Sequence, residues 1–214
     1  MSKVAVFGAT GFAGSHIVEE LLTRGHQVAA VARDVSKVAD RPGLSIIAGS
    51  VEQDDVVARA ADGADVIVAA LPALTDETSL PSAVTKLLAA AAREGARLGV
   101  VGGAGNLRVS EGGPLLAHTE EFPAELHDIA AAHTEALNIL KESDEAIDWF
   151  YFSPAGEFGG HNPGTRTGTF RVGDTILLTD AEGASELSGA DYGIAFVDEI
   201  TTPTRHRAQL TAAY

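Results

Sequence analysis

The sequence predicts a single α/β domain over residues 1–214, built on a doubly wound parallel sheet, and two observations indicate this fold class. Short β-branched runs alternate with helical patterns through the first two-thirds of the chain, which is the rhythm of successive βαβ units. These runs are continuously apolar, so the strands are expected to be covered on both faces, as in a parallel sheet. We find no internal repeat, low-complexity tract or linker that would divide the chain.

Each expected strand is one of these apolar runs, and most are followed by a helical pattern. The strands are expected over residues 3–8, 27–33, 44–49, 64–71, 96–103, 147–153 and 207–214. The helices are expected as a stretch ended by Gly25, a short helix between the second and third strands, and helices over 54–63, 79–95, 124–142 and 188–200. A hairpin turning at Gly173–Asp174 is expected over 168–180, in a small C-terminal region on the substrate side.

The composition excludes several classes of function. A formal net charge of −15 argues against binding to nucleic acid or to anionic membranes, because both need a basic face. With no cysteine, the chain has no disulfide or thiolate metal site, and its seven histidines show no metal-ligand spacing, so no metal is expected. Without an apolar run of about 18 residues or a signal-peptide pattern, we expect a cytoplasmic protein with a small-molecule substrate. A homodimer is left open.

Three evenly spaced glycines, Gly8, Gly11 and Gly14, lie where the first strand runs into the first helix. Gly8 would allow a sharp exit from the strand, Gly11 would leave room for a pyrophosphate, and Gly14 would let the helix pack closely. The N–H groups of residues 10–12 are expected to point at the phosphates, where the helix dipole also favours an anion. The alternative is a glycine-rich tight turn without a ligand, but the strand–turn–helix context favours a dinucleotide.

The residue at the end of the second strand selects between the two dinucleotides. An NAD site usually has Asp or Glu there to accept hydrogen bonds from the ribose, whereas this chain has Arg33, followed by Lys37. A guanidinium can pair with the 2′-phosphate of NADP and stack on adenine. The alternative is a solvated arginine paired with Asp34. We therefore expect NADP(H) as the preferred cofactor and NAD(H) as the second choice.

Four segments, GATGFAG, VARDVSK, ADVIVAALP and VVGGAG, resemble the atypical short-chain dehydrogenase/reductases. With the stretch from Ser153 to Pro203, they resemble more narrowly the NADH-flavin reductases related to biliverdin IX beta reductase and to NmrA-like proteins. The resemblance covers nearly the whole chain and implies a Rossmann fold with hydride transfer from a nicotinamide. Together with position in the fold, it implies these cofactor-binding residues: Gly8, Thr10, Gly11, Phe12, Gly14, Arg33, Leu71, Pro72, Gly102 and Gly103.

The proton-donating pair of ordinary short-chain dehydrogenases is missing. Those enzymes use Tyr-x-x-x-Lys on the helix after the fifth strand, and here Ile129 stands at the tyrosine position and His133 at the lysine position. A dehydrogenase for simple alcohols is therefore not expected. His133 is the candidate catalytic side chain, either as a ribose contact or as a weak acid near neutral pH. The alternative is a helix-face histidine that only fills space.

Two loops, 105–122 and 155–180, are expected to cover the carboxyl ends of the fifth and sixth strands, where ligands bind in such sheets. The residues expected on the substrate side are two aromatic residues and three others: Leu107, Phe122, Ser153, Phe158 and His161. They could cover a flat ring, and the alternative is that the apolar ones only anchor the loops.

Three functions follow, in order of preference. The first is an NAD(P)H-dependent reductase of a flat conjugated acceptor, with free flavin as substrate rather than as a tightly bound group. Such a ring holds the negative charge that the hydride brings, so a missing acid matters little. The second is an NmrA-like sensor that binds the dinucleotide without turnover. The third, a sugar-nucleotide epimerase or dehydratase, is disfavoured by the missing Tyr-x-x-x-Lys.

Overall fold

The computed structural model describes residues 1–36 and 38–214, which form an eight-stranded sheet in the order β3-β2-β1-β4-β5-β6-β8-β7. All neighbouring strands pair in parallel except β7, which lies antiparallel to β8 at one edge. This is the expected doubly wound α/β arrangement. The strands are β1 (Lys3–Phe7), β2 (Gln27–Ala32), β3 (Leu44–Ala48), β4 (Val66–Ala69), β5 (Arg97–Val101), β6 (Trp149–Ser153), β7 (Arg171–Gly173) and β8 (Ala208–Ala213).

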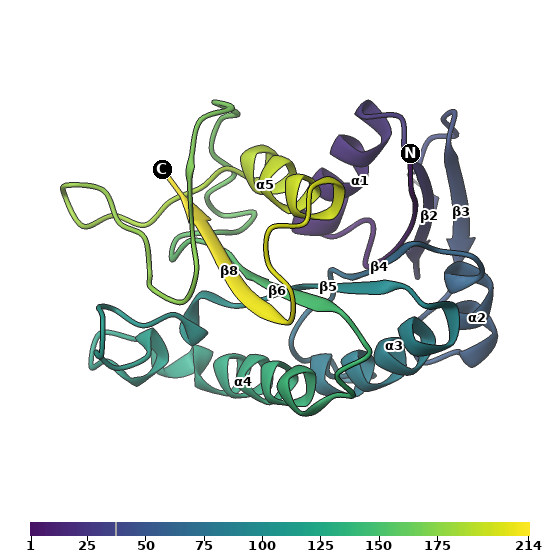
Figure 1. The fold of residues 1–214 in the computed structure, drawn as a ribbon. Coiled ribbons are helices and arrows are strands. Elements are labelled where there is room, and N and C mark those ends of the chain that lie inside the picture. Colours follow the sequence, from purple (N-terminus) through teal and green to yellow (C-terminus); the bar gives the residue numbers. More distant parts are fainter. Residues whose placement is uncertain (37) are drawn as a thin grey trace.

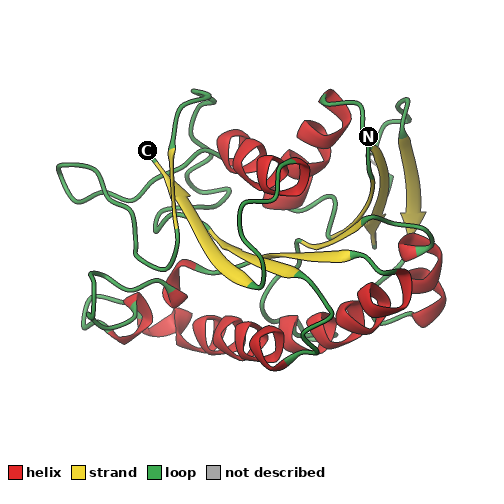
Figure 2. Cartoon of the chain, viewed as in Figure 1, coloured by secondary structure: helices red, strands yellow, loops and turns green. Residues whose placement is uncertain are grey.

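Helices cover both faces of this sheet (Figure 1, Figure 2). One face carries α1 (Phe12–Thr23) and α5 (Gly189–Thr201), and the other carries α2 (Asp54–Ala61), α3 (Leu80–Glu94) and α4 (His127–Glu142). None of the helices in the described residues has the length and apolar character needed to cross a bilayer.

The central strand β1 shows why the strands are continuously apolar in sequence. Val4 and Val6 lie in the core that faces α1 and α5, whereas Ala5 and Phe7 lie in the core that faces α2, α3 and α4. All four side chains are buried. Beyond Lys3 at its start, this strand has no exposed position for a polar residue, which confirms the inference drawn from the missing alternation.

We expected a short helix between β2 and β3. The residues that the structure describes there, 34–36 and 38–43, are not helical, so this prediction is wrong for them. The Asp34 carboxylate accepts the N–H of Ser36 at 2.9 Å, and this local turn satisfies the backbone in place of a helical hydrogen bond. Lys37, a predicted cofactor residue, lies outside the described residues.

The C-terminal region also differs from the expected hairpin. Residues 171–173 form β7, but their partner is β8 rather than the segment that follows Gly173. That following segment pairs instead with Arg108, which donates its N–H to the Thr175 carbonyl and accepts the N–H of Leu177, both at 2.8 Å. The antiparallel partner of β7 is thus a strand from the end of the chain, which local sequence pattern does not reveal.

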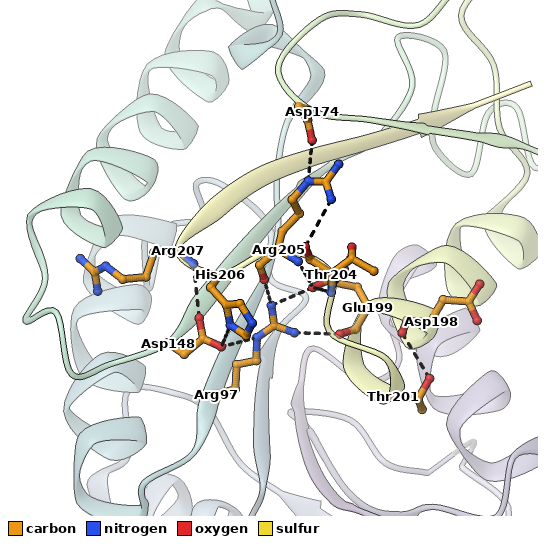
Figure 3. A network of polar contacts seen from close by, with 10 residues as sticks. All are labelled: Arg97, Asp148, Asp174, Asp198, Glu199, Thr201, Thr204, Arg205, His206 and Arg207. Atoms are coloured by element: carbon orange, nitrogen blue, oxygen red, sulfur yellow. Dashed lines mark hydrogen bonds and ion pairs between the residues drawn. The ribbon is translucent and has the colours of Figure 1, made fainter.

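A buried ionic network ties the amino end of β5 to α5 and to the segment before β8 (Figure 3). Arg97 is only 9% exposed and donates to the Glu199 carboxylate at 2.8 Å. Its Nε also lies 2.9 Å from a carboxylate oxygen of Asp148. Glu199 accepts further hydrogen bonds from the Thr204 hydroxyl at 2.6 Å and from the Arg205 N–H at 3.2 Å. These contacts hold the segments at the amino ends of the parallel strands together.

We expect Glu199→Gln to lower the free energy of unfolding at pH 7 by about 2–3 kcal/mol, because Arg97 stays buried with one of its two carboxylate partners gone. The exposed pair between Arg205 and Asp174 supplies a control, and Asp174→Asn should leave stability nearly unchanged. Urea denaturation of both variants would measure the two effects.

The same pair of variants tests the pH dependence. Burial by itself raises the pKa of Glu199, but hydrogen bonds from Thr204, Arg97 and Arg205 outweigh it and hold this pKa below its usual range. The carboxylate therefore contributes stability that is present above the ordinary glutamate pKa and is lost as the pH falls through the lower folded-state value. The difference between wild type and Glu199→Gln should shrink in acid, and a constant difference would contradict this account.

Candidate functional site

A cavity of about 680 Å³ runs along the carboxyl ends of the parallel strands. Its wall includes Arg33 after β2, the glycine loop after β1 and His133 on α4. The strand order reverses between β1 and β4, and such switch points are where α/β sheets bind their ligands. The cavity therefore has the position and the size of a site for a large organic ligand.

Two of the three loop glycines are required by the fold. Gly8 has φ +83°, and a Cβ there would lie 2.1 Å from the carbonyl oxygen of Ala70. At Gly14 a Cβ would lie 2.1 Å from the carbonyl oxygen of Gly8. Gly11 differs, because its φ is −71° and a Cβ would lie 3.3 Å from the Gly8 carbonyl oxygen, a tight contact that a shift of a few tenths of an ångström would relieve. Gly11 also lines the cavity, so a glycine there keeps this part of the wall free of a side chain.

The start of α1 offers unpaired N–H groups to this cavity. Gly11 is the N-cap of α1 and has no side chain to cap it, and within the described residues the N–H groups of Phe12 and Ala13 have no acceptor. The N–H groups of residues 10–12 were all expected to be free for the phosphates. This is wrong for Gly11, whose N–H donates to the Gly8 carbonyl at 3.0 Å. Thr10 and Phe12 line the cavity. Free N–H groups at a helix N-terminus are suited to a phosphate.

Arg33 lies on the cavity wall and pairs with Glu77, whose carboxylate is 2.8 Å from its Nη1. Both side chains are mainly exposed, at 64% and 65%. The alternative of a pair between Arg33 and Asp34 is wrong in this structure, because Asp34 accepts from Ser36 and Arg33 turns to Glu77. Glu77 lies between β4 and α3, and no local sequence pattern marks it as a partner of Arg33.

The middle of the cavity is lined by four residues expected there: Leu71, Pro72, Gly102 and Gly103. A Cβ at Gly102 would lie 2.2 Å from the ring of Tyr151, and one at Gly103 would lie 2.7 Å from the ring of His133. The two glycines after β5 therefore make room for these two rings.

His133 belongs to a chain of polar groups beside the cavity. Its Nδ1 lies 3.0 Å from the hydroxyl of Tyr151, which also accepts the N–H of Gly103 and donates to Oδ1 of Asn106, both at 3.0 Å. The Asn106 amide group donates to the Thr134 hydroxyl at 2.9 Å. That hydroxyl in turn donates to a carbonyl one turn earlier in α4, also at 2.9 Å.

The proton positions in this chain follow from counting donors. Thr134 gives its one proton to the helix carbonyl, so it accepts from Asn106, and only the NH₂ of that amide can donate. The Asn106 oxygen therefore faces Tyr151. Because Tyr151 is its only donor among the described residues, it takes the phenolic proton, and neither Nδ1 of His133 at 3.0 Å nor the His133 carbonyl at 3.4 Å does. Nδ1 of His133 must then carry a hydrogen and donate it to the phenol oxygen.

This arrangement leaves Nε2 of His133 with a free lone pair. His133 lines the cavity, and within the described residues Nε2 has no hydrogen-bond partner. Burial lowers the pKa of His133 to about 4, so the ring is neutral at physiological pH. Burial also raises the pKa of Tyr151 far above its ordinary value, with a small opposing effect of the hydrogen bond from Gly103. The side chain at the lysine position of ordinary short-chain dehydrogenases is thus an uncharged hydrogen-bond acceptor.

Two of the five expected substrate-side residues, Phe122 and Phe158, line the cavity. The ring of Phe158 packs edge-on against Phe12, with 5.1 Å between the ring centroids. Leu126 and Ile129 also line the cavity, although the sequence analysis considered Ile129 only for the missing tyrosine.

The other three expected substrate-side residues do not line the cavity and are corrected here. Leu107 is fully buried beneath its loop, and Ser153 is fully buried, where its hydroxyl accepts from Gln209 at 3.0 Å. His161 is exposed on its loop, 3.9 Å from the Glu157 carboxylate. In the part of the chain that the structure describes, no three acidic, His or Cys side chains are grouped in a way that could hold a metal ion.

The tautomer of His133 can be tested directly. We expect long-range ¹H–¹⁵N NMR of the wild-type protein to show the ring proton on Nδ1. Asn106→Leu, a change of similar shape, removes the acceptor of Tyr151, so the phenolic proton should turn to Nδ1 and the ring proton should move to Nε2. Thr134→Ser keeps the hydroxyl and should leave the tautomer unchanged. A wild-type ring protonated on Nε2 would contradict the proton count.

Comparison with known proteins agrees with this geometry over the whole chain. A sequence profile of the NAD(P)H-binding family matches residues 8–182. The uncharacterized protein YwnB of Bacillus subtilis is 34% identical over 212 residues, which are 98% of this chain and 97% of YwnB.

Two crystal structures extend the similarity to the fold. A protein of Bacteroides thetaiotaomicron, provisionally named an epimerase, has a TM-score of 0.89 and 33% identity, over 100% of this chain and 97% of that one. A provisionally named NADH-flavin reductase of Streptococcus pneumoniae has a TM-score of 0.86 and 32% identity, over 100% and 99% of the two chains. The chain therefore belongs to the NAD(P)H-binding family and has the Rossmann fold of the atypical short-chain dehydrogenase/reductases.

Proposed function

We propose that this protein is an NADPH-dependent reductase that transfers hydride to a flat conjugated acceptor, with a flavin-type ring as the leading substrate. The observation that carries the proposal is one continuous cavity, which joins the free N–H groups of α1 to apolar side chains around Ile129, with His133 on its wall. The similarity to a provisionally named NADH-flavin reductase supports the same class of reaction.

The residues along the cavity fit a nicotinamide dinucleotide. Gly11 leaves open the space that a Cβ would fill, and the N–H groups of Phe12 and Ala13 are free to bind a pyrophosphate. The bound cofactor would supply the hydride. The lone pair on Nε2 of His133 would accept a hydrogen bond from a ribose hydroxyl and so help to orient the nicotinamide.

Of the side chains that the structure places on the cavity wall, none is well placed to donate a proton to the substrate. Among the described residues on its wall, the side chains with charged or titratable groups are Arg33, Glu77 and His133. Arg33 and Glu77 lie at the adenosine end, and His133 presents a lone pair rather than a proton. Reduction of a simple carbonyl needs an acid at the oxygen, whereas a flavin or quinone ring delocalises the charge and takes its proton from water. The geometry therefore favours a conjugated acceptor.

Arg33 and Glu77 together would set the choice between NADPH and NADH. A 2′-phosphate can replace Glu77 as the partner of Arg33, and breaking this exposed pair costs little. The charge-assisted bonds gained are stronger. Because the Glu77 carboxylate stays near and repels the phosphate, Arg33 favours NADPH while Glu77 limits the preference.

Calorimetric titration of both cofactors tests this division. Arg33→Ala should weaken NADPH binding by about one to two powers of ten, since a lost charge-assisted hydrogen bond costs roughly 1.5–3 kcal/mol, and it should leave NADH nearly unchanged. Glu77→Gln should tighten NADPH binding and leave NADH unchanged or weaker. If Arg33→Ala weakened both cofactors equally, Arg33 would be a general adenosine contact instead.

The glycine loop gives a second binding test with a built-in control. Gly11→Val places a branched side chain where the pyrophosphate would lie, so NADPH binding should be lost while the melting temperature changes little. Gly14→Ala should instead destabilise the fold, because its Cβ overlaps the Gly8 carbonyl. NADPH binding of unchanged affinity in Gly11→Val would remove the basis of the cofactor assignment.

The reaction itself is tested by steady-state oxidation of NADPH with flavins, naphthoquinones and biliverdin as acceptors. We expect turnover with conjugated rings, and kcat/KM without a histidine titration between about pH 5 and 8, because the pKa of His133 is about 4. His133→Gln should keep most of kcat. A loss of kcat by about a hundredfold or more would make His133 the proton donor. NADPH binding without turnover of any acceptor would favour the NmrA-like sensor.

A further inference from the structure

The acceptor end of the cavity is apolar and partly open to solvent. Phe122 and Leu126 line it from the segment before α4, Ile129 from the first turn of α4, and Phe158 from the loop after β6. Leu126 is 38% exposed and Ile129 is 42% exposed, so this end of the wall presents apolar side chains to solvent. These side chains suit the face of a flat ring.

The charged side chains of the segment 119–130 beside this end are all of one sign. In the segment 119–130 the apolar residues of the wall alternate with carboxylates, and the segment has no lysine or arginine. All four carboxylates are exposed: Glu120, Glu121, Glu125 and Asp128. Arg33 is the one cationic side chain on the cavity wall among residues 1–36 and 38–214, and it lies at the other end, paired with Glu77.

We propose that the acceptor is an uncharged conjugated ring, and that this protein discriminates against rings that carry a phosphate, carboxylate or sulfonate. The proposal rests on the reductase function and specifies its substrate class. An anionic group inside the apolar end would be buried without a partner, which is costly. An anionic group left at the mouth would face the four carboxylates of segment 119–130, in a chain whose net charge is −15.

Riboflavin and flavin mononucleotide are a matched pair of probes, because they share the same ring and differ by the phosphate. Their dissociation constants for the full-length protein saturated with NADP⁺ can be measured by quenching of flavin fluorescence. We expect riboflavin to bind about three- to tenfold more tightly at low salt, with the difference shrinking as salt screens the repulsion. Equal binding, tighter binding of the phosphate form, or no binding of riboflavin would overturn the proposal.

Charge-reversal variants locate the effect on the protein. Glu121→Lys with Glu125→Lys should remove most of the difference between the two flavins, because both residues are exposed beside the apolar end. Glu142→Lys with Glu145→Lys is the matched control: it changes the net charge equally at the far end of α4 and should leave most of the difference in place. Equal effects of the two double variants would mean that net charge, not the segment 119–130, sets the selectivity.

The binding readout separates this proposal from the reductase function. Selective binding of riboflavin without NADPH oxidation would contradict the reductase and keep the uncharged-ring preference. Turnover of both flavins with equal kcat/KM and equal affinity would keep the reductase and contradict the preference.

Discussion

The position of the cavity depends on the close packing of three backbone segments at the start of α1. Gly8 after β1, Gly14 in α1 and Ala70 after β4 lie so near one another that a Cβ at either glycine would overlap a carbonyl oxygen. This contact brings α1 close to the sheet at the point where the strand order reverses. The N-terminus of α1 therefore opens onto the carboxyl edge of the sheet, and the cavity forms around it. The position of the start of α1 beside the cavity depends on this tight packing.

Stabilising contacts and the candidate ligand site lie at opposite ends of the strands. At the amino ends of the strands, Arg97 and Glu199 are buried and hydrogen-bond to each other, and Glu199 also accepts from the Thr204 hydroxyl. At the carboxyl edge, the N–H groups that begin α1 are left without acceptors in the described residues. The loop after β6, which has little secondary structure of its own, is held by Asp191, whose carboxylate accepts from the Thr167 N–H and the Tyr214 hydroxyl. Buried carboxylates are thus paired at the amino ends of the strands, whereas backbone N–H groups at the carboxyl ends are left free for a ligand.

The chain from Thr134 through Asn106 and Tyr151 to His133 shows how remote groups determine the chemistry of a site. A histidine in water titrates near neutral pH and exchanges freely between two tautomers. Here burial keeps the ring neutral, and the donor count places its proton on the side away from the ligand. His133 therefore presents a fixed hydrogen-bond acceptor to the cavity rather than an acid, which agrees with the proposed acceptor ring that stabilises its own charge.

The sequence by itself determined the parallel sheet, the glycine loop and the place of Arg33, because these depend on local periodicity and on short spacings along the chain. Lys37 stays a prediction outside the described residues. Only the tertiary structure decided that β7 pairs with β8. The same holds for the contact of Arg33 with Glu77, 44 residues apart in sequence, and for that of Tyr151 with Asn106, 45 residues apart. Only the structure shows that Leu107, Ser153 and His161 do not line the cavity. Contacts between distant segments follow from how the layers pack, and a single sequence carries no local pattern for them.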